Sequence, residues 1–122
     1  MVQSESTLPV DHFTGLRLDT PLQTSFTTGE AIRLSGLLTD TSLTQVLFRY
    51  TPTNGDDPIR YYFDVMDGRF DGHLLFSHEQ AGEYELYIYA GYTGQSLPWL
   101  GNFSPVQVLQ GQGEIYLPID FF

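Results

Sequence analysis

The chain is 122 residues long, the usual size of one folded domain, and 41% of its residues are hydrophobic and 15% aromatic. This apolar content excludes a disordered chain, because disordered chains lack the apolar surface that offsets the loss of conformational entropy. Fifteen acidic side chains face five basic ones, all of them arginine, and the net charge is −10. Nucleic acids and anionic lipids are bound through clustered lysine and arginine, so we expect neither as a partner.

There are no cysteines, which excludes a disulfide framework, a thiolate nucleophile and a cysteine-based zinc site. No apolar run approaches the ~20 residues that a membrane-spanning helix needs, so we expect no membrane insertion. Residues 1–12 are polar and have neither the basic residues nor the apolar stretch of a signal peptide. We expect them to form a loose N-terminal segment.

Apolar and polar residues alternate with a period of two between turn signals, which is the pattern of half-buried strands. No stretch of 11 or more residues shows a helical period. The alternation predicts one all-β domain over residues 13–110, followed by an edge strand or a linker over 111–122. In chain order, the predicted strands cover 13–18, 22–27, 30–38, 44–50, 59–65, 69–77, 83–92 and 103–109.

Three local signals refine this pattern. Asp67-Gly68 is a dipeptide favoured in two-residue type I′ turns, so 59–65 and 69–77 are predicted to form a hairpin. The glycine-rich segment 91–101 is predicted to be an exposed loop that carries Trp99. Pro105 interrupts the last strand, and this predicts a bulge or an edge position there.

Two stretches resemble immunoglobulin-like and fibronectin type III-like modules of bacterial surface and secreted proteins. They are TGEAIRLSGLLTD at 28–40 and DGRFDGHLLFSHEQAGEYELYIYA at 67–90. The second stretch, continued to Tyr92, also resembles small β domains that accompany transglutaminase-like peptidase domains. The resemblance implies an immunoglobulin-like sandwich of about seven to nine antiparallel strands in two sheets, with Tyr84 in a tyrosine corner whose hydroxyl bonds the backbone. It also implies an accessory role and an extracellular or cell-surface location.

The candidates for catalysis are the histidines and their neighbours. An enzyme needs a nucleophile with a base, an acid and base pair, or a metal. His73 alternates with core positions and is predicted to point outward, while Ser77 and His78 are neighbours in a turn and would point to opposite faces of an extended chain. His12 lies in the loose segment. We therefore expect no catalytic site.

Asp64, Asp67 and Asp71 surround one predicted turn, and carboxylates are the ligands that calcium prefers. Their spacing of three and then four residues does not match a calcium loop of EF-hand type. The alternative is that Asp67 serves the turn, while Asp64 and Asp71 pair with Arg60 or Arg69 across strands. Calcium is the one cofactor that the sequence leaves open.

One outward sheet face is predicted to be rich in aromatic residues and arginine. If Tyr84, Leu86 and Ile88 face the core, their neighbours on the same and adjoining strands face out. Aromatic residues and arginine are typical of protein interfaces, and rings on a sheet also stack on sugars. Alternatively, cross-strand tyrosines stabilise the sheet, or the apolar tail 115–122 covers them. The predicted binding residues are Arg49, Arg60, Tyr62, Tyr87, Tyr89 and Trp99.

These observations favour a non-catalytic structural or protein-interaction module whose partner is another protein or a neighbouring domain. The alternative hypothesis is a carbohydrate-binding module that uses the same aromatic face.

Overall fold

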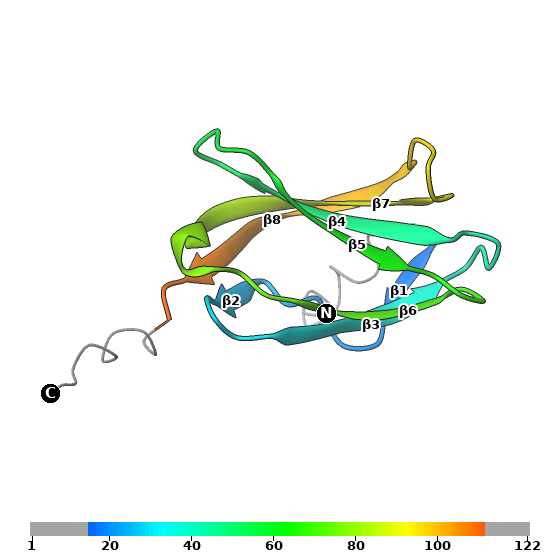
Figure 1. The fold of residues 1–122 in the computed structure, drawn as a ribbon, viewed down its shortest axis with the longest axis horizontal. Coiled ribbons are helices and arrows are strands. Elements are labelled where there is room, and N and C mark those ends of the chain that lie inside the picture. Colours follow the sequence, from blue (N-terminus) through cyan, green and yellow to red (C-terminus); the bar gives the residue numbers. More distant parts are fainter. Residues whose placement is uncertain (1–14, 112–122) are drawn as a thin grey trace, which may run out of the picture.

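The computed structural model describes residues 15–111, and within that range the chain forms two β-sheets packed as a sandwich (Figure 1). A single turn of 3₁₀ helix, η2(His78–Gln80), is the one helical element of the described range after β1. The strands are β1(Leu16–Leu18), β2(Ser25–Thr27), β3(Ile32–Leu38), β4(Gln45–Pro52), β5(Ile59–Asp64), β6(Arg69–Leu74), β7(Gly82–Gly91) and β8(Trp99–Leu109).

The three-stranded sheet has the order β1-β3-β6, and the five-stranded sheet has the order β2-β8-β7-β4-β5. The all-β sandwich expected from the alternation is therefore confirmed. Residues 1–14 and 112–122 lie outside the described residues, which removes from view the predicted segment 1–12 and all but the first residue of the predicted segment 111–122. None of the helices in the described range could cross a membrane.

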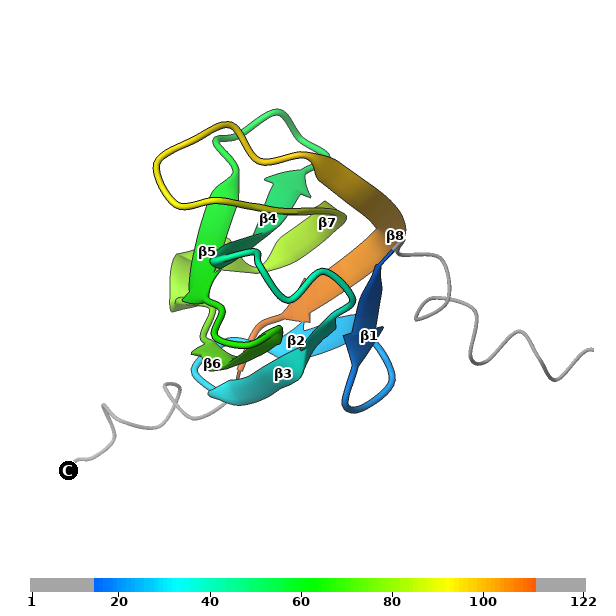
Figure 2. The ribbon, with the colours of Figure 1, turned by 90° about the vertical axis from the view of Figure 1, so that its right-hand side faces the viewer.

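One strand pairing departs from the antiparallel prediction. β1 and β2 follow each other in the chain but join different sheets, and β2 runs parallel to β8. The intervening segment contains Pro21, which has no backbone N–H for a sheet ladder. Because the chain crosses from one sheet to the other at this point, β2 reaches the edge of the five-stranded sheet in the same direction as β8 (Figure 2).

The turn of the predicted hairpin is confirmed, but the predicted pairing of its two strands is wrong. Asp67 and Gly68 both have positive φ, and Met66 and Arg69 exchange backbone hydrogen bonds across them, as in a type I′ turn. However, β5 pairs with β4 and β6 pairs with β3, in different sheets. Apolar side chains of both strands instead face each other across the sandwich, where the rings of Phe63 and Phe70 lie 6.0 Å apart.

The core between the sheets is built mainly of aromatic rings. The inward residues of β4, Val46, Phe48 and Tyr50, are at most 1% exposed, as the alternation predicted. Neighbouring rings meet edge to face or tilted, the geometry that the quadrupoles of aromatic rings prefer. The rings in contact are Phe26, Phe48, Tyr50, Tyr61, Phe63, Phe70, Phe76 and Tyr84.

Tyr84 has the geometry expected of a tyrosine corner. Its ring is buried against Tyr50 and Phe76, and its hydroxyl donates a hydrogen bond to the carbonyl oxygen of Gln80, four residues upstream. Burial raises the pKa of the Tyr84 phenol, so the hydroxyl keeps its proton and remains a donor. This bond ties the start of β7 to the last residue of η2.

Gly72→Ala is expected to lower the free energy of unfolding by about 1–3 kcal/mol, as overpacking of a close-packed core does. A Cβ atom added at Gly72 would lie 2.3 Å from Cδ1 of Phe63, so the ring or the strand must shift. Urea unfolding measures the loss. In a Phe63→Leu background the same substitution should cost less, because the ring is gone. An equal cost in both backgrounds would show that the clash is not the cause.

Tyr84→Phe is expected to destabilise the domain by about 1 kcal/mol, because it removes the hydroxyl and leaves the Gln80 carbonyl without this partner. Tyr92→Phe is the matched control, since the Tyr92 hydroxyl contacts Ser42 on the exposed surface. That change should stay within about 0.5 kcal/mol. Equal losses in the two variants would mean that the corner bond contributes no special stability.

Candidate functional site

The outward face of the five-stranded sheet carries a row of apolar and aromatic side chains across four strands. Leu47 in β4 is paired with Tyr62 in β5 on one side and with Tyr89 in β7 on the other, and Tyr89 is paired with Trp99 in β8. The side chains of Tyr62 and Trp99 are 53% and 58% exposed, whereas Leu47 between the tyrosines is buried. We call Tyr62, Leu47, Tyr89 and Trp99 the aromatic row.

Trp99 reaches this face because of an irregularity in β8. Ile88 is paired with Gly101, but Tyr89 is paired with Trp99, so Leu100 is the extra residue of a bulge. Without the bulge, Trp99 would lie on the inner face of the sheet, since side chains alternate. The prediction that Trp99 lies in a loop is wrong, because it begins β8, and its predicted exposure is confirmed. The predicted bulge at Pro105 is also confirmed by a shift in register there.

A second row lies directly beside the first. Arg49 in β4 is paired with Arg60 in β5 and with Tyr87 in β7, and Tyr87 is paired with Asn102 in β8. Like charges directly opposite each other on neighbouring strands are destabilising. The two ion pairs of the described residues, Arg33 with Asp71 and Arg69 with Asp19, leave both of these arginines without a carboxylate. We call Arg60, Arg49, Tyr87 and Asn102 the arginine row.

The guanidinium of Arg49 is held over two tyrosine rings. Its central carbon lies 4.9 Å from the centre of the Tyr87 ring and 5.2 Å from that of Tyr89, within the range of cation–π attraction. Its Nε atom is buried and has no hydrogen-bond partner among the described residues. The rings therefore fix the position of a positive charge whose hydrogen-bonding capacity is incompletely used.

Two residues at this end of the face were not singled out from the sequence: Asn102, in the arginine row, and Glu85, beside it. Asn102 donates a hydrogen bond of 2.9 Å to the Glu85 carboxylate, and hydrogen bonding with Glu85 raises the pKa of Tyr87. The only sequence signal for Glu85 is its place in the alternation of β7. For Asn102 that signal fails, because β8 contains two register shifts.

The tail 115–122, which the sequence suggested as an alternative cover of this face, lies outside the described residues.

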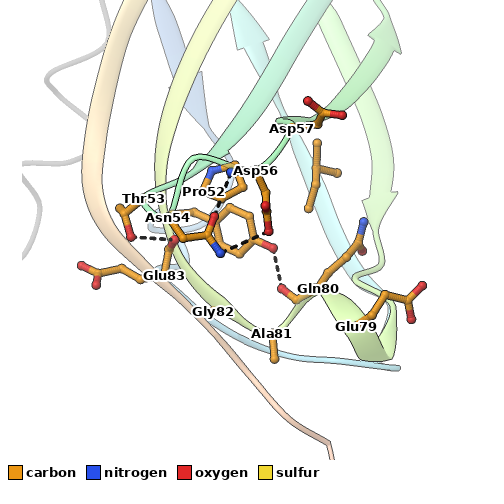
Figure 3. Close-up of a pocket in the computed structure, with 12 residues that line it drawn as sticks. Pro52, Thr53, Asn54, Asp56, Asp57, Glu79, Gln80, Ala81, Gly82 and Glu83 are labelled. Atoms are coloured by element: carbon orange, nitrogen blue, oxygen red, sulfur yellow. Dashed lines mark hydrogen bonds between the residues drawn. The ribbon is translucent and has the colours of Figure 1, made fainter.

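A cavity of about 160 Å³ lies at one end of the sandwich, where the β4–β5 loop meets η2 (Figure 3). Its lining includes Asp56, Asp57, Glu79 and Glu83 but no histidine or arginine. The side chains of Asp57, Glu79 and Glu83 point away from one another in Figure 3. This cavity therefore presents no convergent acid and base.

The histidines of the described range lie apart from one another in the fold. His73 is exposed on β6 opposite Arg33, as predicted. His78 begins η2, and its ring is in hydrogen-bond contact with the side-chain amide of Gln110. The Ser77 backbone N–H donates to the Gln80 side chain, which makes Ser77 the cap of this helical turn. His12 lies outside the described residues.

The structure separates the three carboxylates that the sequence placed around one turn. Asp64 ends β5 in the five-stranded sheet, whereas Asp71 lies in β6 and binds the Arg33 guanidinium with both oxygens, at 3.0 and 2.6 Å. This ion pair lowers the pKa of the Asp71 carboxyl. In residues 15–111 no three acidic or histidine side chains could hold a metal together. The calcium cluster of Asp64, Asp67 and Asp71 that the sequence left open is therefore not formed, because β5 and β6 belong to different sheets.

No protein-family model matches the chain, and a search of the curated proteins finds no match. Arguments about the outward face therefore depend on its own geometry.

Calcium is expected to leave thermal unfolding unchanged, because the carboxylates do not converge. A site occupied at 100 times its dissociation constant stabilises by about 2.7 kcal/mol, which shifts the midpoint of a domain of this size by several degrees. Unfolding would be followed by circular dichroism in millimolar calcium and in EDTA at equal ionic strength. A higher midpoint in calcium alone would contradict this assignment, and Asp64→Asn would then show whether Asp64 is involved.

Proposed function

We propose that this chain is a non-catalytic protein-interaction module and that its contact surface is the outward face formed by the aromatic row and the arginine row. The observation that carries the proposal is the Arg49 guanidinium, held over Tyr87 and Tyr89 with no carboxylate partner among the described residues. Arginine and aromatic side chains are the residues that dominate binding energy in protein interfaces. Here Arg49 and the two tyrosines already contact one another, so these side chains lose little rotamer entropy when a partner binds.

The chemistry of the face favours a partner with carboxylate groups beside apolar side chains. Arg49 and Arg60 lie together although the chain has a net charge of −10 and three times as many acidic as basic residues. An acidic peptide or loop would supply the carboxylates that the protein itself does not supply here, and bidentate pairing suits a planar guanidinium. Exposed Tyr62 and Trp99 would contact its apolar side chains at the two borders of the face.

The strand order supports an accessory role. Immunoglobulin-like sandwiches combine one sheet of order A-B-E with another in which F lies between C and G, and variable types add C′ beside C. Here β1-β3-β6 corresponds to the first sheet, and β8-β7-β4-β5 corresponds to the second. The hydrogen bond from the Tyr84 hydroxyl to the Gln80 carbonyl also supports this correspondence, because a tyrosine corner is typical of such sandwiches. We propose that the chain serves as an accessory domain of a larger surface or secreted protein and acts outside the cell.

A carbohydrate-binding module is the alternative. Sugar-binding modules present open ring faces on which pyranose rings stack. In this structure the Arg49 guanidinium already lies over Tyr87 and Tyr89, which leaves Tyr62 and Trp99 as the exposed rings of the face. These two rings stand at opposite ends of the aromatic row, with Leu47 and Tyr89 between them. This arrangement favours an extended protein contact over stacking on a single sugar.

Affinity capture with matched variants tests the proposal. The wild-type chain, Arg49→Ala, Trp99→Ala and a Leu75→Ala control are immobilised and exposed to extract of the source organism, and retained proteins are quantified. The side chain of Leu75 is 52% exposed, similar to the 58% of Trp99. Leu75 follows β6, which belongs to the other sheet. We expect a defined partner to be retained by wild type and Leu75→Ala and lost at least tenfold with either face variant.

Two outcomes would contradict this proposal. Equal retention by all four chains would place the contact elsewhere on the molecule. A rise of several degrees in the unfolding midpoint with one class of soluble oligosaccharide, abolished by Trp99→Ala, would instead support the carbohydrate alternative.

A further inference from the structure

β5 leaves one side of its backbone unpaired at the margin of the five-stranded sheet (Figure 2). Paired residues of antiparallel strands alternate between hydrogen-bonded and non-hydrogen-bonded pairs. Val65 N–H donates to the carbonyl of Thr44, and Thr53 N–H donates to that of Glu83, so odd positions of β5 are bonded to β4. The N–H and C=O groups of Arg60, Tyr62 and Asp64 therefore point away from β4, toward the open edge.

The side chains at these same three positions are exposed on the outward face. Neither Arg60 nor Asp64 takes part in the ion pairs of the described residues. The other edges differ. β1 and β2 have three residues each, and the charged side chains of β6 next to its turn are already engaged, Arg69 by Asp19 and Asp71 by Arg33. Among the described edge strands, β5 is thus the one longer than three residues in which the exposed acidic and arginine side chains take part in no ion pair.

We propose that a second copy of this chain pairs with the first, edge to edge along β5, in an antiparallel arrangement about a two-fold axis at Tyr62. In this register Arg60 of each copy lies opposite Asp64 of the other, and the two Tyr62 side chains lie opposite each other. All three outward residues form hydrogen-bonded pairs, because they have the same parity. The two five-stranded sheets become one continuous sheet.

Charge selects this register over its neighbours. A two-fold axis at Arg60 would place arginine opposite arginine, and one at Asp64 would place carboxylate opposite carboxylate, both of which are destabilising. An axis at Tyr61 would place Arg60 opposite Tyr62, and one at Phe63 would place Tyr62 opposite Asp64, so neither register brings opposite charges together. In the monomer Arg60 faces Arg49 and has no carboxylate partner among the described residues. The proposed register brings the Asp64 carboxylate of the second copy beside Arg60.

This association goes beyond the proposed function, since it uses the border of the outward face and leaves Arg49, Tyr87 and Trp99 open to another protein. One pair of six-residue edges buries little surface, so we expect a weak, concentration-dependent dimer.

Sedimentation equilibrium of the purified chain from about 10 µM to about 1 mM tests the proposal, because contacts of this size are weak and transient. The wild-type mass should rise toward twice the monomer mass. Asp64→Arg and Arg60→Asp should each weaken self-association about tenfold or more, because each places like charges opposite each other in the dimer. Glu30→Arg, an exposed position away from β5, makes the same charge change as Asp64→Arg and should leave dimerisation intact.

One mixture and one double variant make the result specific to the register. An equimolar mixture of Asp64→Arg and Arg60→Asp chains should dimerise again, since each introduced charge then faces its opposite. The double variant Arg60→Asp/Asp64→Arg should dimerise by itself for the same reason. Circular dichroism of each variant confirms that it is folded.

A wild-type chain that stays monomeric to 1 mM overturns the proposal, and so do single variants that associate as strongly as wild type. Failure of the mixture to dimerise excludes this register. None of these outcomes bears on the outward face, whose test uses Arg49 and Trp99 and a different partner.

Discussion

The packing of aromatic rings between the two sheets is the interaction on which the rest of this structure depends. Tyr50 and Phe76 lie at its centre, each in contact with Phe26, Tyr61 and Tyr84 from other elements. Because such rings bury a large area each, they favour two sheets face to face over one extended sheet. The same requirement separates β5 from β6 and leaves the edge of β5 unpaired.

The outward face follows from this core. When one set of alternate residues is buried between the sheets, the opposite set must face out, and the register then decides which of them are neighbours. Arg49, Tyr87 and Tyr89 are brought together in this way by the pairing of β4 with β7. A surface that combines stacked arginine with exposed rings is thereby obtained from ordinary sheet geometry.

Sequence reasoning succeeded where a single strand contains the information. The alternation in β4 and β7 placed Phe48 and Ile88 in the core and Tyr87 and Tyr89 outside. It failed at the start of β8, where Trp99 was predicted in a loop but lies in the strand, beside a bulge at Leu100 that turns it onto the outward face. It also failed at β6, since the local pattern of a strand does not say whether its neighbour in the chain is also its neighbour in the sheet.

The sequence by itself determined that this chain is an all-β sandwich without cysteine chemistry, because composition and period-two alternation are local properties of the chain. It also determined the Asp67-Gly68 turn, since few dipeptides adopt positive φ at both positions. Only the tertiary structure decided which strands pair, that Asp64 and Asp71 belong to different sheets, and that Arg49 and Arg60 lie side by side. Pairing is decided by the burial of residues far apart in the chain, and no local pattern contains that information.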